Sequence, residues 1–291
     1  MITKAIWDFR IASDIIHSDD TKIVIEDLID AVNYARNDGC MINCCDDFYY
    51  EVVDGVSFSD WLYDKNTPPN LIEVKRELAI SLSRGTPITR KDYDETRCAI
   101  ETQDVKECLS MALHISKESI LYIFDIQRYL EAKQWYLSEF VNQDRFVDEA
   151  IECFPNLVFH ENVSSSINTL NAEFRIVRPF IVKHLCALNK YQQDTSLSKD
   201  STIGFREIAS KIQELYSIEC STQSGRDSAE DLYYTFKDEE TGVTDKVCCE
   251  LHTKLKWKDM DKENQDRIYF HPGKEDMCNK KILIAHIGTH K

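Results

Sequence analysis

Three strand patterns close to the end of the chain constrain its fold most strongly. Residues 247–255, 266–271 and 281–291 are rich in β-branched, aromatic and other apolar side chains. A charged segment separates the first two patterns, and a Pro-Gly pair follows the second. Strand-like segments bounded by turn residues are typical of an antiparallel meander. We therefore predict an antiparallel β-meander in this part of the chain.

Charge is distributed unevenly along the sequence. The 291 residues carry a formal net charge of −16. From Lys246 onward ten Lys and Arg face seven Asp and Glu, a local +3, so the preceding residues carry −19. A strongly acidic body repels nucleic acid, so contact with a polyanion is expected only near the C-terminal region.

Composition indicates a cytoplasmic globular protein. The hydrophobic fraction of 43% is large enough to build a core. No apolar run approaches the ~18 residues of a membrane span, and the first ten residues lack the apolar centre of a signal peptide. Eleven irregularly spaced cysteines suggest reduced thiols. Neither a phosphate-binding glycine loop nor a Gly-x-Ser-x-Gly motif occurs, and we expect no cofactor.

Periodicity and turn residues predict an α+β protein rather than a regular βαβ winding. The polar stretch 192–202 predicts a linker. We expect an acidic, helix-rich mixed domain of unassigned role over residues 1–200 and a second domain over residues 201–291. The predicted helices are 21–37, 70–83, 106–114, 125–142, 146–153, 163–174 and 179–191 (with Pro179 at its first position) and 205–216, and the predicted strands before the meander are 48–53, 120–124, 156–160 and 232–236.

Alternation along residues 247–257 separates a polar face from an apolar one. The polar face holds Glu250, His252, Lys254 and Lys256. An acid, an imidazole and two ammonium groups in one stripe can bind phosphate and transfer protons. A solvated face with a cross-strand ion pair is the alternative interpretation.

Short motifs in this region resemble the C-terminal sheet of the RelE/ParE/HigB-like toxins. The resemblance lies within residues 201–291 and implies two helices followed by an antiparallel sheet. It also implies endonuclease activity on mRNA, free or on the ribosome. The motifs are Glu250-Leu251 with Lys254, then Arg267-Ile-Tyr-Phe270, and finally Ile282-Leu-Ile with Ile287-Gly288 and His290-Lys291.

The resemblance assigns roles position by position. It implies that basic residues hold the scissile phosphate and that His252 or His290 transfers protons. No metal is required for this chemistry. The predicted catalytic residues are His252, Lys254, Arg267 and His290, and the predicted substrate-binding residues are Lys256, Tyr269, His271 and Lys291.

Three departures from the toxin pattern leave two hypotheses open. The tyrosine that some members carry after the last strand has no counterpart, residues 273–280 form an insertion, and the acidic region over residues 1–200 is additional. The first hypothesis is a toxin-like, RNA-directed effector, an endoribonuclease of an anti-phage or toxin–antitoxin system, with RNA, the ribosome or an antitoxin as partner. The second is a non-catalytic scaffold of a prokaryotic defence system that uses the sheet as a docking platform.

Two other sites are less favoured. Restriction-type nucleases need a Glu-x-Lys pair, whereas Glu250 and Lys254 are four positions apart. Cys40, Cys44 and Cys45 could form half of a metal site, but no second pair at matching spacing occurs, so we expect buried thiols.

Overall fold

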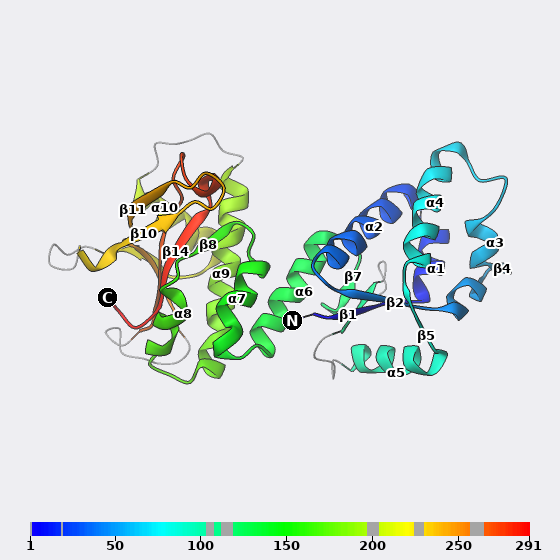
Figure 1. The fold of residues 1–291 in the computed structure, drawn as a ribbon, viewed down its shortest axis with the longest axis horizontal. Coiled ribbons are helices and arrows are strands. Elements are labelled where there is room, and N and C mark those ends of the chain that lie inside the picture. The colour runs from blue at the N-terminus through cyan, green and yellow to red at the C-terminus, as the bar shows by residue number, and fades with distance from the viewer. Residues whose placement is uncertain are drawn as a thin grey trace. The chain divides into compact units, whose positions relative to one another are not determined.

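The computed structural model describes residues 2–18, 20–102, 108–111, 119–196, 204–223, 230–256 and 265–291. The chain forms two compact units, Met1–Tyr136 (unit 1) and Leu137–Lys291 (unit 2), whose elements are labelled in Figure 1. Taken as a whole the chain is α+β, as predicted. Among the described helices, none has the length and apolarity needed to cross a membrane.

Unit 1 contains a five-stranded sheet in which every pair of neighbours is parallel. The order is β5-β2-β1-β6-β7. From the central strand β1 the chain proceeds to β2 and β5 on one side of the sheet. It then crosses to the other side and forms β6 and β7. The strands are β1 (Lys4–Trp7), β2 (Met41–Cys45), β5 (Thr86–Ile88), β6 (Cys108–Met111) and β7 (Tyr122–Ile123), and a separate short hairpin joins β3 (Val52–Val53) to β4 (Val56–Ser57).

Helices cover both faces of this sheet. Figure 1 shows α2 and α4 on one face and α5 on the opposite face, the arrangement expected when crossovers reverse direction at β1. The apolar positions of α2 point inward, since Leu28, Ala31 and Val32 are fully buried. The helices of unit 1 are α1 (Arg10–Ile16), α2 (Thr21–Asn37), η1 (Asp46–Tyr50), α3 (Phe58–Leu62), α4 (Pro69–Ser83), α5 (Arg90–Glu101) and most of α6 (Ile126–Glu139).

Within unit 1 the expected absence of βαβ winding is wrong. The strands β1 and β2 are short, and buried parallel strands lack the polar–apolar alternation that reveals exposed ones. The helix predicted at 106–114 is also wrong, because its described residues form β6; the rest of that prediction lies outside the described residues. Of the strand predicted at 48–53, residues 48–50 lie in the 3-10 helix η1, and only Val52–Val53 form a strand, β3.

Unit 2 is built on a mixed five-stranded sheet in the order β8-β14-β13-β12-β9. The three consecutive strands of the predicted meander are present and antiparallel. The last of them, β14, lies inside the sheet, because β8 pairs with its other side in parallel. The strands are β8 (Leu157–Phe159), β9 (Cys220–Thr222), β12 (Leu251–Lys254), β13 (Arg267–His271) and β14 (Ile282–Gly288).

The region predicted as one strand over residues 247–257 is two strands in two sheets. Strand β11 (Thr244–Cys248) pairs with β10 (Tyr233–Lys237) in a separate hairpin. The chain then passes through Cys249, whose backbone N–H donates to the carbonyl of Leu232, and enters β12. The hairpin buries one apolar side against the main sheet in a cluster of Tyr234, Phe236, Val247, Cys249, Met277, Leu283 and Ala285.

The helices of unit 2 show why the division lies before residue 200. Helix α9 is longer than predicted, so Pro179 lies inside it. Its Arg178 guanidinium donates to the carbonyls of Ser138, Glu139 and Val141 at the end of α6. Together with β8, this helix belongs to unit 2, and the boundary predicted at residue 200 is replaced by one at Tyr136. The helices are α7 (Gln143–Cys153), α8 (Val163–Ser166), η2 (Ile167–Thr169), α9 (Phe174–Ser196) and α10 (Phe205–Tyr216).

This division predicts how fragments fold. Residues 137–291 should unfold cooperatively on heating, whereas residues 201–291 should not, because they lack β8 and the buried face of α9. Circular dichroism with thermal unfolding measures the difference. A sharp thermal transition in the 201–291 fragment would contradict the division.

Candidate functional site

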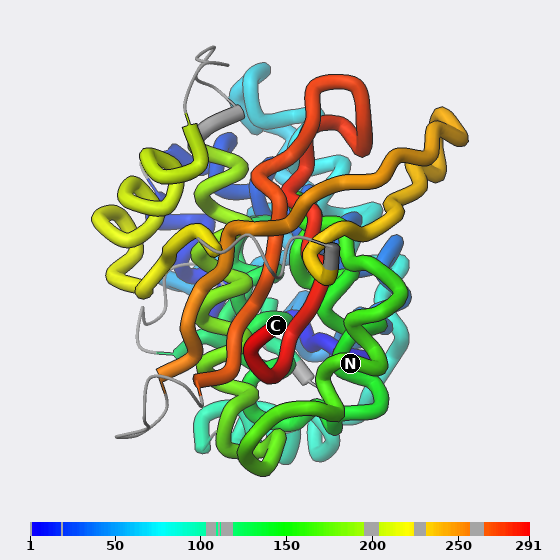
Figure 2. The backbone as a smooth tube through the Cα atoms, turned by 90° about the vertical axis from the view of Figure 1, so that its left-hand side faces the viewer, coloured from blue at the N-terminus to red at the C-terminus, as the bar shows by residue number. Residues whose placement is uncertain are grey.

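Polar side chains form two adjacent rows across one face of the unit 2 sheet. Strand pairing places them opposite one another, so their order follows from the register. Figure 2 shows the strands that carry them, with the chain turning back after β14. We call this set the polar rows: Ser221, His252, Tyr269 and His286 in the first, and Glu219, Lys254 and Arg267 in the second, which ends where Arg267 faces Gly288.

The first row brings a hydroxyl to an imidazole. Ser221 Oγ and His252 Nε2 are 3.0 Å apart, and His252 Nδ1 lies 3.4 Å from the carbonyl of Glu250. The tautomer with hydrogen on Nδ1 would donate to that carbonyl and leave Nε2 to accept from Ser221. Ser221 also lines a surface cavity of about 520 Å³, with Gln213, Ser217, Glu219 and Lys256 among its other walls. A hydroxyl and a base in hydrogen-bond contact beside a cavity can take part in nucleophilic or proton-transfer chemistry.

The Glu219 carboxylate pairs with two lysines, Lys254 in β12 and Lys256 just after it. Lys254 Nζ lies 2.5 Å from Glu219 Oε1, and Lys256 pairs with the other oxygen of Glu219. Hydrogen bonds from the two ammonium groups lower the pKa of Glu219 to about 2. Two positive charges against one negative leave a local excess of one positive charge.

Arg267 and Tyr269 form the buried centre of the rows. Arg267 Nη1 donates to the Tyr269 hydroxyl at 3.3 Å, and the backbone N–H of Lys291 donates to the same oxygen at 3.1 Å. Gln223 Nε2 donates to the carbonyl of Lys291, and His286 Nε2 lies 3.0 Å from the carbonyl of Thr289. These hydrogen bonds hold residues 289–291 against this face of the sheet.

Two buried nitrogens in this centre make no hydrogen bond within the described residues. They are Arg267 Nε and His286 Nδ1. An unpaired buried donor or acceptor costs about 1–3 kcal/mol, so such groups call for an explanation beyond packing.

Burial keeps three histidines of the unit 2 sheet neutral at pH 7. Burial is the main cause that lowers the pKa of His252, His271 and His286 to about 4 in each case. A nearby positive charge adds to the effect, from Arg267 for His252 and from Lys291 for His286. Burial also lowers the pKa of Arg267.

The structure gathers some of the predicted site residues and separates others. His252, Lys254, Arg267 and Tyr269 share the polar rows, and Lys256 reaches them through Glu219. Lys291 contributes its backbone. His271 lies at the far end of β13, where its Nδ1 accepts from Gly273 and its ring contacts Phe205. His290 is exposed on the segment after β14.

Sequence reasoning missed four residues of this face: Glu219, Ser221, Gln223 and His286. The first three lie on or beside β9, which was not predicted, and Ser221 is 31 positions from its partner His252. The alternation of β14 does place His286 at a defined face, but a bulge between Tyr269 and Phe270 shifts the register there. Only the order of the strands in the sheet places these four residues beside the predicted ones.

The buried histidines predict loss of stability in acid. Their folded pKa values lie below the ordinary value of 6.5, so the stabilisation is complete above pH 6.5 and is lost as the pH falls toward 4. Protonation should cost on the order of 2 kcal/mol per histidine. The melting temperature of unit 2 should therefore fall between pH 6.5 and 4.5, and less steeply in His252→Gln. The exposed His17→Gln serves as the control, and equal slopes in all three proteins would contradict the prediction.

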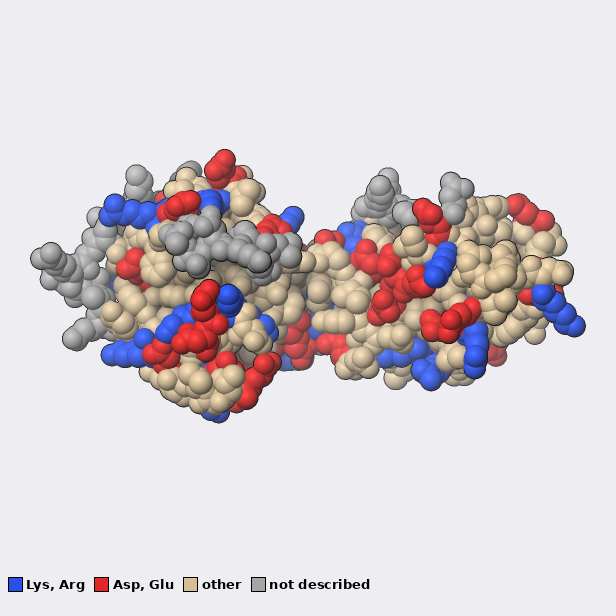
Figure 3. Space-filling view, turned by 90° about the horizontal axis from the view of Figure 1, so that it is seen from above, with Lys and Arg blue, Asp and Glu red and all other residues tan. Residues whose placement is uncertain are grey.

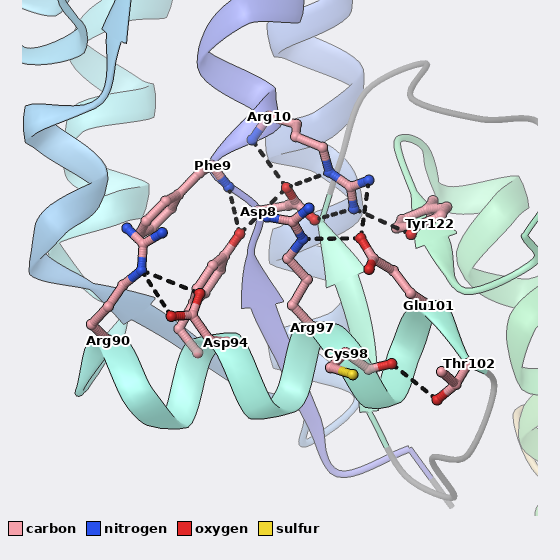
Figure 4. A network of polar contacts seen from close by, with 11 residues as sticks. Asp8, Phe9, Arg10, Arg90, Asp94, Arg97, Cys98, Glu101, Thr102 and Tyr122 are labelled. Carbon is pink, nitrogen blue, oxygen red and sulfur yellow. Dashed lines mark hydrogen bonds and ion pairs between the residues drawn. The ribbon is translucent and has the colours of Figure 1, made fainter.

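A second polar cluster lies at the carboxyl end of β1 in unit 1 (Figure 4). Asp8 directly follows the strand and is fully buried. Arg10 binds both of its oxygens, with Nε at 2.9 Å from Oδ1 and Nη2 at 2.7 Å from Oδ2. Arg10 also reaches Tyr122 and Glu101, and Arg97 donates to the same Glu101 oxygen.

Aromatic rings extend this cluster toward α5. Phe9 and Tyr93 stack with ring centroids 4.1 Å apart, and the Tyr93 hydroxyl accepts the backbone N–H of Phe9. Arg90 lies over the Phe9 ring and pairs with Asp94. In parallel sheets ligands bind beyond the carboxyl ends of the strands where the strand order reverses, which here is between β1 and β6. Arg10, Arg90 and Arg97 each already pair with a carboxylate. The cluster therefore serves mainly to hold this edge of the unit 1 sheet together.

Removing the Asp8 charge should destabilise unit 1. Asp8→Asn leaves the half-buried Arg10 guanidinium without its bidentate partner, and we expect a loss of roughly 2–4 kcal/mol in the free energy of unfolding. Asp94→Asn breaks an exposed ion pair and should cost less than about 1 kcal/mol. Urea unfolding of the unit 1 transition measures both. Equal effects of the two changes would show that Asp8 has no special role.

Among the described residues, no group of three or more His, Cys, Asp or Glu is placed to hold a metal ion. Cys40, Cys44 and Cys45 are buried, as expected for thiols in a core. Comparison with protein families, curated proteins and solved structures gives no match to this chain.

Proposed function

We propose that the chain is a toxin-like, RNA-directed effector whose phosphate chemistry takes place at the polar rows of unit 2. The observation that carries this proposal is the contact between His252 and Ser221 at the wall of a cavity that Lys256 also lines. The strand motifs that resemble those of the RelE/ParE/HigB-like toxins are the second ground for the proposal. The motifs concerned are those that contain Lys254, Arg267 and His290.

The proposed chemistry uses Lys256 in the wall of this cavity, other side chains of the polar rows and His290 after β14. A phosphate of RNA would compete with Glu219 for Lys254 and Lys256, since its two non-bridging oxygens can each accept from one ammonium group. His252 is neutral at pH 7 and can accept a proton at Nε2, where Ser221 now lies. The ribose 2′-oxygen would then attack phosphorus, and the 5′-oxygen would leave with a proton from a second acid. His290, exposed after β14, is the proposed acid.

The proposal predicts the effect of substitutions at the cavity. Replacing His252, Lys254 and Arg267 together should abolish RNA cleavage and growth arrest in cells that express the chain. His252→Gln with Lys256→Gln tests the same site with less disturbance of the core. Lys237→Gln is the matched control, because Lys237 and Lys256 are equally exposed at 59% and both pair with a glutamate.

A second candidate, the docking platform, is favoured by the burial of the rows. His252, Arg267 and Tyr269 are all less than one-tenth exposed. Figure 3 shows basic and acidic side chains interspersed on the face of unit 2 that it draws, without a continuous basic patch. If the full chain and residues 137–291 leave growth and RNA unaffected but copurify with one defined protein, the platform replaces the enzyme. Cleavage of plasmid only with Mg²⁺ would instead indicate a DNA nuclease.

A further inference from the structure

Unit 1 contains a cavity that no step of the proposed function uses. Its volume is about 680 Å³, within the range of about 300–1,000 Å³ found for small-molecule sites. One wall is the outer face of α4, with Ile72, Arg76 and Ile80 at helical spacing. The opposite wall is the end of α3 and the loop that follows it, including Tyr63 and Lys65.

A buried lysine lies in the wall of this cavity. Lys75 is only 5% exposed. Its Nζ donates to the carbonyl of Trp61 at 2.6 Å and to Thr67 Oγ1 at 3.1 Å, and lies 3.9 Å from the centre of the Trp61 ring. A buried ammonium group is costly unless it is hydrogen-bonded or paired with an anion. No carboxylate of the described residues forms an ion pair with Lys75, although an ammonium group has three hydrogens to donate.

The rim of the cavity combines apolar surface with unpaired positive charge. Tyr63, Ile72 and Ile80 are exposed, which is unusual for three large apolar side chains around one opening. Lys65 and Arg76 form no ion pair within the described residues, although the protein as a whole carries −16. The Asp64 carboxylate also lies at the rim, where it accepts the backbone N–H of Asn66.

We propose that this cavity binds a small carboxylate with an apolar body, of the fatty-acid or aromatic-acid kind. The carboxylate would accept from Lys75 inside the cavity, and the apolar body would cover Ile72, Ile80 and Tyr63. Lys65 and Arg76 at the rim would attract the anion and exclude cations of similar shape. The proposal concerns unit 1 alone and does not depend on RNA chemistry in unit 2.

Titration calorimetry of the full chain with decanoate tests the proposal. Decanoate should bind saturably at one site, and decanol, which has the same chain without the charge, should bind at least about tenfold more weakly. Lys75→Met should weaken decanoate binding by about tenfold or more. Ile72→Glu, at an exposed position, should abolish binding by placing a negative charge in the cavity while leaving the melting temperature unchanged.

The controls make each outcome decisive. Lys91→Gln changes an exposed lysine of α5 and should leave decanoate binding unchanged. If Lys75→Met melts early, Ile72→Glu alone decides the result. The proposal is overturned if the natural sequence does not bind decanoate, if decanol binds as tightly, or if decanoate still binds after Ile72→Glu.

Discussion

The position of β14 inside its sheet is the constraint on which the rest of unit 2 depends. All seven of its residues are buried, and it pairs with β13 on one side and with β8 on the other. Ser166 reinforces the strand, because its hydroxyl both donates to the carbonyl and accepts from the N–H of Ile287. Gly288 ends the strand where a Cβ atom would collide with the backbone of Ser166, so no larger residue fits without displacement.

The polar rows owe their alignment to this strand order. A shift of one residue in any pairing would move His286 or Tyr269 to the opposite face. A single hydrogen bond such as that between Ser221 and His252 contributes only about 0.5–1.5 kcal/mol net, so it cannot set the register. The apolar face, with Ile268, Phe270 and Ile287 fully buried, sets it instead. The polar rows are therefore positioned by apolar residues on the opposite face of the sheet.

Sequence reasoning succeeded where periodicity and local turns decide the structure. Helices α2 and α10 match their predicted residues, and β12, β13 and β14 lie within the three predicted meander segments, although the first of these segments also contains part of β11. It failed where pairing with distant segments decides, as for the short strands β1, β2, β6 and β9. For the same reason His252, Lys254 and Arg267 could be named from the sequence, whereas Ser221 and Glu219 could not. Alternation gives the face of a residue, but only strand order gives its neighbour.

The inner placement of β14 also governs when unit 2 can fold during synthesis. Unit 1 is complete once residue 136 has left the ribosome, and can fold while the remainder is still being made. Strands β8 and β13 must wait for residues 282–288, and Ser166 and Ile287 are 121 positions apart. Until then both strands present unpaired edges, which are sites of aggregation. The polar rows therefore form only in a chain that has been translated through β14.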